Sequence, residues 1–276
     1  MLGDDVRVFA ALLGIALSAS TASLAAQPDW KVRTIELGDT VDQVKAKIDA
    51  LNKTLPAGMN EGFVIANSSR LLPDGQEVLS GIVAVRNGMG NVREVIQVKI
   101  DPWTQKSYSI GRIAIFESAA RIDTTNEYYQ IRGTVDELVG RWGAHFVGHP
   151  KADGSGVRYW FYDGYSGEPL SGSVLESGKF EQRCRPNAKA PVIPPSASEV
   201  RELPFSDPAT IDPACGRLAS VEIQGSSSSP GYIKLMIVQT TDFVAMSEFW
   251  RNMRLVQDEV NKKYEQKVKR APVPPQ

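Results

Sequence analysis

The sequence predicts an α+β protein with two tandem units, each a helix plus an antiparallel sheet, and a long C-terminal helix. Three observations lead to this prediction. Two segments 94 residues apart, 35–48 (IELGDTVDQVKAKI) and 129–142 (YQIRGTVDELVGRW), share a Thr-Val-Asp helix start. Strand-like runs bounded by turn residues follow both segments. The apolar residues between positions 242 and 269 recur at helical spacing.

The first 26 residues are predicted to be a cleaved signal peptide. Residues 8–17 form an unbroken run of apolar and small residues, and the small residues that follow end in Ala25 and Ala26. This matches the region before a signal-peptidase site, with cleavage near Ala25 or Ala26. The run is about half the length of a transmembrane helix, which needs roughly 20 apolar residues. We therefore expect a periplasmic or secreted protein without a transmembrane segment; the alternative is a buried N-terminal helix.

The charge balance disfavours nucleic acid as a partner. The chain has 31 basic and 32 acidic residues. The signal segment holds Asp4, Asp5 and Arg7, so the mature chain carries 30 of each sign. Nucleic-acid binding depends on clustered Lys and Arg. The acidic start departs from the positive first region that signal peptides usually have.

The first unit is predicted to span 27–124. Thr40 and Gln43 fit a capping box, in which each side chain accepts from the other residue's backbone N–H. Strands are expected at 62–69, 78–86, 92–100 and 108–116, with a Gly- and Asn-rich turn at 86–91. The alternation in 92–100 predicts a sheet with one packed face and one polar face. The apolar stripe of the helix consists of Val41, Val44, Ile48 and Leu51.

The second unit is predicted to span 125–240 and to begin with a matching capping box at Thr134 and Glu137. Strands are expected at 157–163, 217–223 and 232–239. A proline-rich insertion, 181–216, contains Cys184 and Cys215. In an exported chain, two cysteines predict a disulfide, which would stabilise the fold by roughly 3–4 kcal/mol. Free thiols or a redox pair are the alternatives, although the C-x-x-C spacing is absent. The apolar stripe consists of Val135, Leu138, Val139 and Trp142.

Residues 241–270 are predicted to form the C-terminal helix, with Asp242 as its N-cap. Lysines crowd its end, where cations suit the helix dipole. This favours a solvated helix end over a membrane-binding patch. Residues 271–276 (APVPPQ) are expected to be a disordered tail. The apolar face consists of Met246, Phe249, Trp250, Met253, Val256 or Val260, and Tyr264.

The repeated unit resembles the β-lactamase inhibitory protein-like superfamily, to which the small lipoprotein of the outer-membrane β-barrel assembly machine is related. The resemblance covers about 35–239. It implies tandem helix-plus-sheet units and a function in protein binding. This chain lacks the lipid-anchor cysteine and adds both the proline-rich insertion and the long final helix. The matching residues are Gly38, Thr40, Gln43 and Val44, with Gly133, Thr134, Glu137 and Leu138.

Motifs for catalysis, cofactors and metals are weak or incomplete. His145 and His149 have a spacing that could bind zinc on a helix, but the surrounding Gly and Pro residues predict a loop. Two carboxylate pairs, Asp163 with Glu168 and Asp136 with Glu137, have local explanations in a turn and a helix start. No nucleophile elbow or phosphate-binding loop is complete. We therefore expect no enzyme activity, no cofactor and no metal.

The aromatic strand 157–162 (VRYWFY) carries the candidate binding face. Alternation places Arg158, Trp160 and Tyr162 on one side, and these residue types are enriched at interfaces. The alternative is that both sides of the strand are buried. The leading hypothesis is thus an exported, non-catalytic protein that binds another envelope protein or assists envelope assembly. The alternatives are an envelope hydrolase or inhibitor of a secreted or periplasmic enzyme, and a structural domain docked on anionic lipid.

Overall fold

The computed structural model describes residues 29–55, 62–87, 92–116, 131–144, 146–163, 168–170 and 216–269. Several predictions fall outside these ranges. They are the signal peptide, the paired cysteines Cys184 and Cys215, His145, most of the proline-rich insertion and the C-terminal tail.

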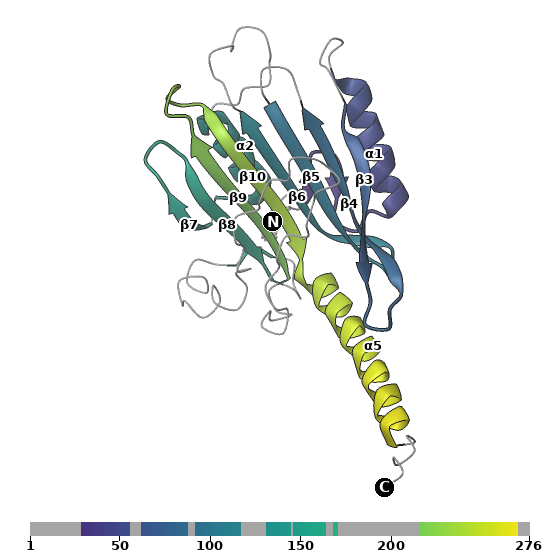
Figure 1. Ribbon diagram of the computed structural model, residues 1–276. Coiled ribbons are helices and arrows are strands. Elements are labelled where there is room, and N and C mark those ends of the chain that lie inside the picture. Colours follow the sequence, from purple (N-terminus) through teal and green to yellow (C-terminus); the bar gives the residue numbers. More distant parts are fainter. Residues whose placement is uncertain are drawn as a thin grey trace, which may run out of the picture.

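The described residues form one eight-stranded antiparallel sheet, a short hairpin and three helices, which confirms the α+β prediction (Figure 1). The sheet order is β3-β4-β5-β6-β10-β9-β8-β7, and every neighbouring pair is antiparallel. The strands are β3 (Val64–Leu71), β4 (Glu77–Asn87), β5 (Val92–Asp101), β6 (Lys106–Phe116), β7 (Val147–Pro150), β8 (Gly156–Tyr162), β9 (Arg217–Gly225) and β10 (Ile233–Asp242). The hairpin is β1 (Lys31–Val32) with β2 (Ile35–Glu36), and the helices are α1 (Val41–Thr54), α2 (Ile131–Trp142) and α5 (Phe243–Lys269).

The two halves of the sheet have the same connectivity. Helix α1 precedes β3 to β6, and α2 precedes β7 to β10. In each half, strands that follow one another in sequence are neighbours in the sheet. The halves meet at β6 and β10, which pair from Leu235↔Ile115 to Thr241↔Ser109. One continuous sheet therefore links the strands of the two halves.

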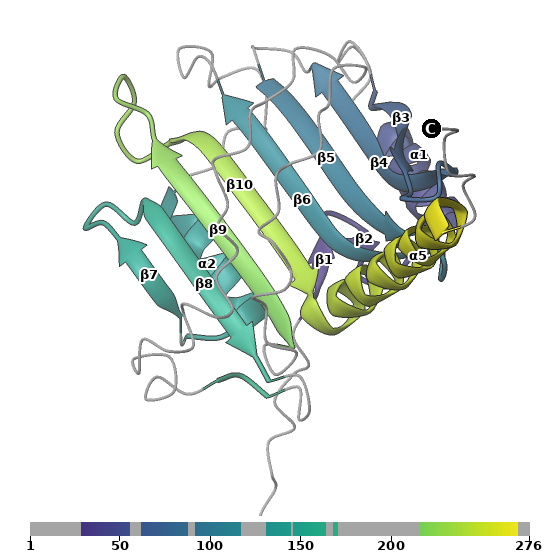
Figure 2. The ribbon, with the colours of Figure 1, turned by 60° about the horizontal axis from the view of Figure 1, so that its bottom comes forward.

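The main core lies between the sheet and the layer formed by α1, α2 and the hairpin (Figure 2). Its apolar side chains come from both halves. Val44 and Ile48 of α1 and Leu138 and Trp142 of α2 are buried at positions 94 residues apart. The predicted apolar stripes of the two helices therefore face the same core.

The opposite face of the sheet is not simply polar, contrary to the expectation from 92–100. At one end of this face, Phe161 of β8 and Leu218 of β9 pack against Phe243 at the start of α5. A separate apolar cluster spans β4, β5 and β6, because the outward positions of these strands are also rich in β-branched residues. The buried members of that cluster are Val83, Val85, Val95 and Ile113.

The capping box at Thr40 is confirmed. Gln43 N donates to Thr40 Oγ1 over 3.4 Å, and Thr40 N donates to Gln43 Oε1 over 2.8 Å. Gly38, just before the cap, has φ +91°, a conformation that favours glycine. The start of α1 is thus set by its local sequence.

The capping box at Thr134 is wrong, because α2 begins three residues earlier, at Ile131. The Ile131 side chain is buried, and its N–H donates to Gly231 O over 2.9 Å. Thr134 and Gly133 therefore lie inside the helix. Glu137 instead pairs with Arg141 one turn later, at 2.8 Å. Contacts with the β9–β10 turn, rather than the local cap signal, set where α2 starts.

Helix α5 leaves the body at one end of the sheet and projects away from it (Figures 1 and 2). Its predicted N-cap is confirmed, since Asp242 Oδ1 accepts from Ala245 N over 3.0 Å. Among the described residues, none of the helices combines the length and apolar character needed to cross a bilayer.

Candidate functional site

The aromatic face of β8 is buried. The exposed fractions of Arg158, Trp160 and Tyr162 are 4%, 1% and 2%. The three side chains point toward α2, whereas Tyr159 and Phe161 point to the side where α5 packs. Of the two possibilities left open by the sequence, burial is the one found. The structure therefore does not present this face to a partner protein.

Trp160 and Tyr162 hold the C-terminal end of α2. Tyr162 Oη donates to Trp142 O over 2.6 Å, and Trp160 Nε1 donates to Gly143 O over 2.8 Å. These carbonyls lie at a helix end, where no intrahelical donor follows. Burial raises the pKa of Tyr162 to about 12, so its hydroxyl stays protonated at physiological pH. The aromatic residues of β8 thus have a structural role.

Arg158 differs from its neighbours, because its guanidinium is buried without a hydrogen-bond partner for Nε or Nη1. Its Cζ lies 5.4 Å from the centre of the Phe146 ring. Desolvation lowers the pKa of Arg158, although an arginine remains charged in proteins. A buried cation with open donors is therefore present next to the edge strand β7.

A second buried charge, at Glu94 of β5, was not predicted. Its carboxylate accepts from Arg33 Nε and Nη2 at 2.9 Å, from Arg86 Nη2 at 2.8 Å and from Arg112 Nε at 2.5 Å. Burial by itself would raise the pKa of Glu94, but the charges and hydrogen bonds of Arg112, Arg33 and Arg86 hold that pKa well below its usual range. A sequence clue existed, since Glu94 shares its side of the strand with Ile96 and Val98. The site is an ion cluster of the core.

The other chemical candidates do not converge. His149 lies exposed in β7, opposite Val157. Asp163 N donates to Glu168 O over 2.9 Å, so these two residues are joined through their backbones. Asp136 lies on α2. Within the ranges that the structure describes, no group of three or more His, Cys, Asp or Glu side chains is arranged to hold a metal.

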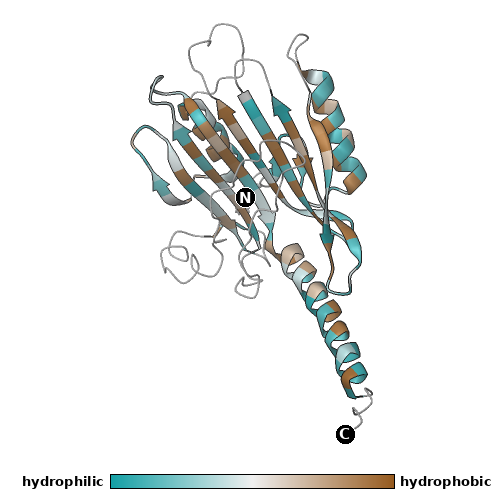
Figure 3. Ribbon diagram, viewed as in Figure 1, coloured by the Kyte–Doolittle hydropathy of each residue, from teal (hydrophilic) through white to brown (hydrophobic). Residues whose placement is uncertain are grey.

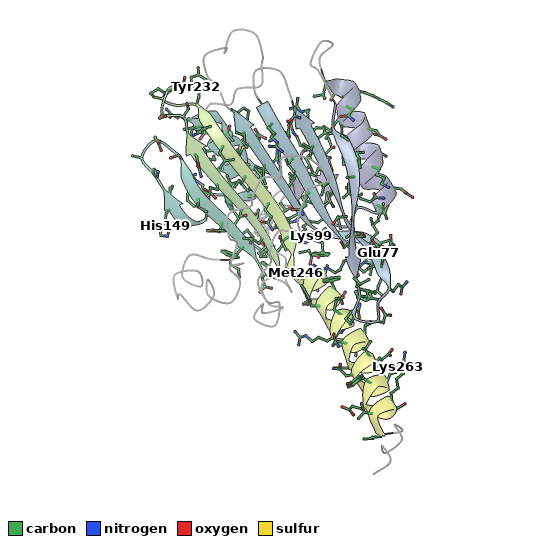
Figure 4. All side chains as sticks on the ribbon, in the orientation of Figure 1. Glu77, Lys99, His149, Tyr232, Met246 and Lys263 are labelled. Carbon is green, nitrogen blue, oxygen red and sulfur yellow. The ribbon has the colours of Figure 1, made fainter. Side chains whose placement is uncertain are left out.

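The projecting part of α5 carries several exposed apolar side chains. We call residues 254–269 the distal helix. Every residue from Asn261 to Lys269 is exposed, and the exposed fractions of Tyr264 and Val268 are 69% and 55%. In Figure 4, Met246 lies where α5 meets the sheet and Lys263 lies on the projecting part. Helical spacing places Val260, Tyr264 and Val268 on the same side as Met246, which is buried in the body.

The distal helix thus continues a stripe that begins in the protein core. Steps of three or four residues keep this stripe on one side of α5, and Figure 3 shows apolar residues recurring toward its C-terminal end. The polar side carries five basic and three acidic residues, and four of the basic ones lie in the last eight residues. The stripe is Met246, Phe249, Met253, Val256, Val260, Tyr264 and Val268.

Comparison of the chain with protein-family models, with curated proteins and with solved structures finds no match. The functional interpretation therefore depends on the sequence and the geometry described above.

Proposed function

We propose that the chain is an exported, periplasmic, non-catalytic protein that binds another envelope protein through the distal helix. The observation that carries this proposal is the apolar stripe of α5, which is buried at the base of the helix and exposed beyond it. A stripe needed only for folding would end where the contacts with the sheet end.

The proposed binding mode is a helix in a groove. Such helices present apolar anchors at positions such as i, i+3 and i+7, the spacing of Met253, Val256 and Val260. Fully burying a side chain such as Val268 contributes roughly 1.5–3 kcal/mol. A helix of about 16 residues is marginal alone in water, but here the folded base at Phe249 already orders its first turns. Binding would therefore cost less ordering entropy than for a free peptide.

Charge defines the partner further. The distal helix has a net charge of +2, and Lys262, Lys263, Lys267 and Lys269 lie near its end. A groove with an apolar floor and acidic residues along its rim would complement it. The partner is therefore expected to be a protein with an acidic-rimmed apolar groove.

The envelope location is supported by the signal-like segment and by the even number of cysteines. We also propose that the two halves arose by duplication. The shared connectivity and the equivalent buried positions, Val44 with Leu138 and Ile48 with Trp142, support this. The same features agree with the resemblance to the β-lactamase inhibitory protein-like superfamily, whose members bind proteins.

Site-specific photocrosslinking in living cells tests the proposal. A photoreactive phenylalanine replaces Tyr264 in the stripe or, as a matched control, Leu255, which is 57% exposed. Nine residues at 100° per residue place the two side chains on opposite sides of the helix. We expect position 264, and not position 255, to crosslink one envelope protein. Equal crosslinking at both positions, or none at 264, would contradict the proposal.

Two other results, one from the crosslinking and one from a separate vesicle-binding assay, would also count against the proposal. A crosslink between two copies of the chain would indicate self-association instead of a separate partner. Binding of the purified chain to anionic vesicles, lost in a Tyr264→Ser variant, would indicate a lipid surface. If the partner is found, Tyr264→Ser is expected to weaken the complex by about 30-fold, the effect of removing a buried tyrosine anchor worth about 2 kcal/mol.

A further inference from the structure

The two edge strands of the sheet, β3 and β7, differ in how they are protected (Figures 1 and 2). β7 has four residues, including Gly148 and Pro150, and a short edge strand with a proline resists pairing with another chain. β3 has eight residues, contains no proline and carries one charged side chain, that of Arg70. Within the described ranges β3 pairs only with β4. We call the side of β3 that faces away from β4 its open edge.

Two contacts show that the even-numbered residues of β3 point their backbone groups toward β4. Just after the strand, Leu72 N donates to Gln76 O over 2.8 Å. Within it, Ser68 O accepts from Ser80 Oγ of β4 over 3.3 Å. The N–H and C=O groups of successive residues point to opposite sides of a strand. The odd-numbered residues of β3 therefore direct their backbone groups to the open edge.

The open edge begins after Phe63. Phe63 N donates to Asn52 Oδ1 over 2.6 Å, and Asn52 Nδ2 donates to Phe63 O over 3.0 Å. The Asn52 side chain thus satisfies both backbone groups, as a neighbouring strand would. For the four odd-numbered residues that follow, the described strands and helices supply no such partner at this edge. These residues are Ile65, Asn67, Ser69 and Leu71.

The four residues are self-complementary in one antiparallel register. With Ser68 opposite Ser68 of a second copy, Ile65 lies opposite Leu71 and Asn67 lies opposite Ser69. All four odd-numbered residues of each copy are then paired, and each such pair exchanges both of its N–H···O bonds. Apolar side chains meet apolar ones, and polar side chains meet polar ones, which favours cross-strand pairing.

Exposure and charge agree with this register. Leu71 is apolar but 67% exposed, and Ile65 of a second copy would cover part of it. Arg70, the one charged residue of β3, would lie opposite Ala66 and not opposite a second Arg70. The register therefore avoids placing like charges directly opposite each other, which would be destabilising.

The adjacent register fits less well. Centring the pair of strands on Asn67 would place Leu71 opposite Phe63. The backbone groups of Phe63 are already bonded to Asn52, so this pair could not form its hydrogen bonds. The same shift would place Ile65 opposite a serine.

We propose that the open edge of β3 binds a second copy of this chain, with the two β3 strands antiparallel about a two-fold axis at Ser68. Such an axis uses the same surface on both copies, as most homodimers do. The pairing joins two eight-stranded sheets into one. It involves β3 and not the distal helix, so it goes beyond the proposed function and its failure would leave that proposal intact.

Cysteine substitution at the two-fold axis tests the register. The even-numbered residues form the non-hydrogen-bonded pairs, in which opposite Cα atoms lie about 4.5 Å apart, a distance that suits a disulfide. Ser68→Cys in the purified chain should therefore give a covalent dimer on oxidation, seen on a non-reducing gel. Ala66→Cys is the matched control, because its two copies would lie four residues apart, roughly 14 Å along the strands. The wild-type chain, which keeps Cys184 and Cys215, sets the background.

Sedimentation of the purified chain tests the pairing without an added cysteine. We expect the mass of the wild-type chain to rise from one copy toward two as the concentration increases. Asn67→Pro removes an N–H from the open edge and leaves the bonds to β4, so it should keep the fold by circular dichroism and stay monomeric. A wild-type chain that stays monomeric, or equal crosslinking by Ser68→Cys and Ala66→Cys, would overturn the proposal. A mixed disulfide of Ser68→Cys with a different protein in cells would overturn it in favour of another occupant.

Discussion

Replacing Glu94 with glutamine removes the buried carboxylate to which three arginines donate. The side chain of Glu94 is 1% exposed and that of Arg86 is 2% exposed, whereas that of Arg33 is 28% exposed. Breaking a buried ion pair by removing one partner typically costs about 3–5 kcal/mol, because the remaining charge stays buried. Arg33 can relax toward water and lower this cost. Glutamine keeps one acceptor oxygen, so the lower half of that range is expected.

A change of this size is measurable. About 3 kcal/mol is a large part of the 5–15 kcal/mol that stabilises a typical protein. For a chain of about 250 residues, it corresponds to a decrease in Tm of roughly 6–12 °C. The assay is urea unfolding of the purified mature chain at pH 7, followed by tryptophan fluorescence. Glu137→Gln is the matched control, because the exposed pair with Arg141 should contribute only about 0.3–0.5 kcal/mol.

The pH dependence provides an independent check. The pKa of Glu94 is lower in the folded state than in the unfolded chain, so the unfolded state binds more protons in acid. The free energy of unfolding should therefore fall as the pH decreases below about 4.5, by up to about 1.4 kcal/mol per pH unit from this residue. Glu94→Gln should remove that part of the slope. A stability within about 1 kcal/mol of wild type, or an unchanged slope between pH 4.5 and 3, would refute the reasoning.

Three smaller perturbations test individual contacts. Thr40→Ala removes the cap of α1 and should lower the free energy of unfolding by about 1 kcal/mol in urea titrations; no change would mean that the capping box is replaced by water. Tyr162→Phe leaves Trp142 O without its donor and should cost about 1–3 kcal/mol, with no effect expected if water reaches this carbonyl. Gly143 has φ +93°, so Gly143→Ala should lower stability by about 1–2 kcal/mol and reduce the Tm in calorimetry. An unaltered Tm would show that α2 can end in another way.

The fold was predictable where local patterns and packing agree. The strands β4, β5 and β6 are long, β-branched and bounded by turn residues, so their positions follow from the sequence. β7 was not predicted, because four residues that include Gly148 and Pro150 carry little strand propensity. The hairpin of β1 and β2 was missed for a similar reason, since each strand has two residues. These elements depend on tertiary contacts.

The candidate site was harder to predict than the fold. Alternation correctly separated Arg158 and Trp160 from Tyr159, but it could not show which side α2 covers. The ion cluster was missed because its four members come from four separate segments, and Arg33 and Glu94 are separated by 61 residues. The accessible stripe of α5 was visible in the sequence as an apolar helix face. Only its arrangement in space shows that the face continues beyond the body.

The pairing of β6 with β10 affects how the polypeptide acquires its structure. β6 ends at Phe116, and β10, the strand that pairs with it at the centre of the sheet, ends at Asp242. Roughly 120 residues must therefore be synthesised after β6 before β10 can cover its edge. At 5–20 residues per second this takes about 6–25 s. During that interval the β-branched edge of the nascent first half is open to pairing with other chains. Delayed closure of this kind favours slow folding and makes a holding chaperone useful until translation is complete.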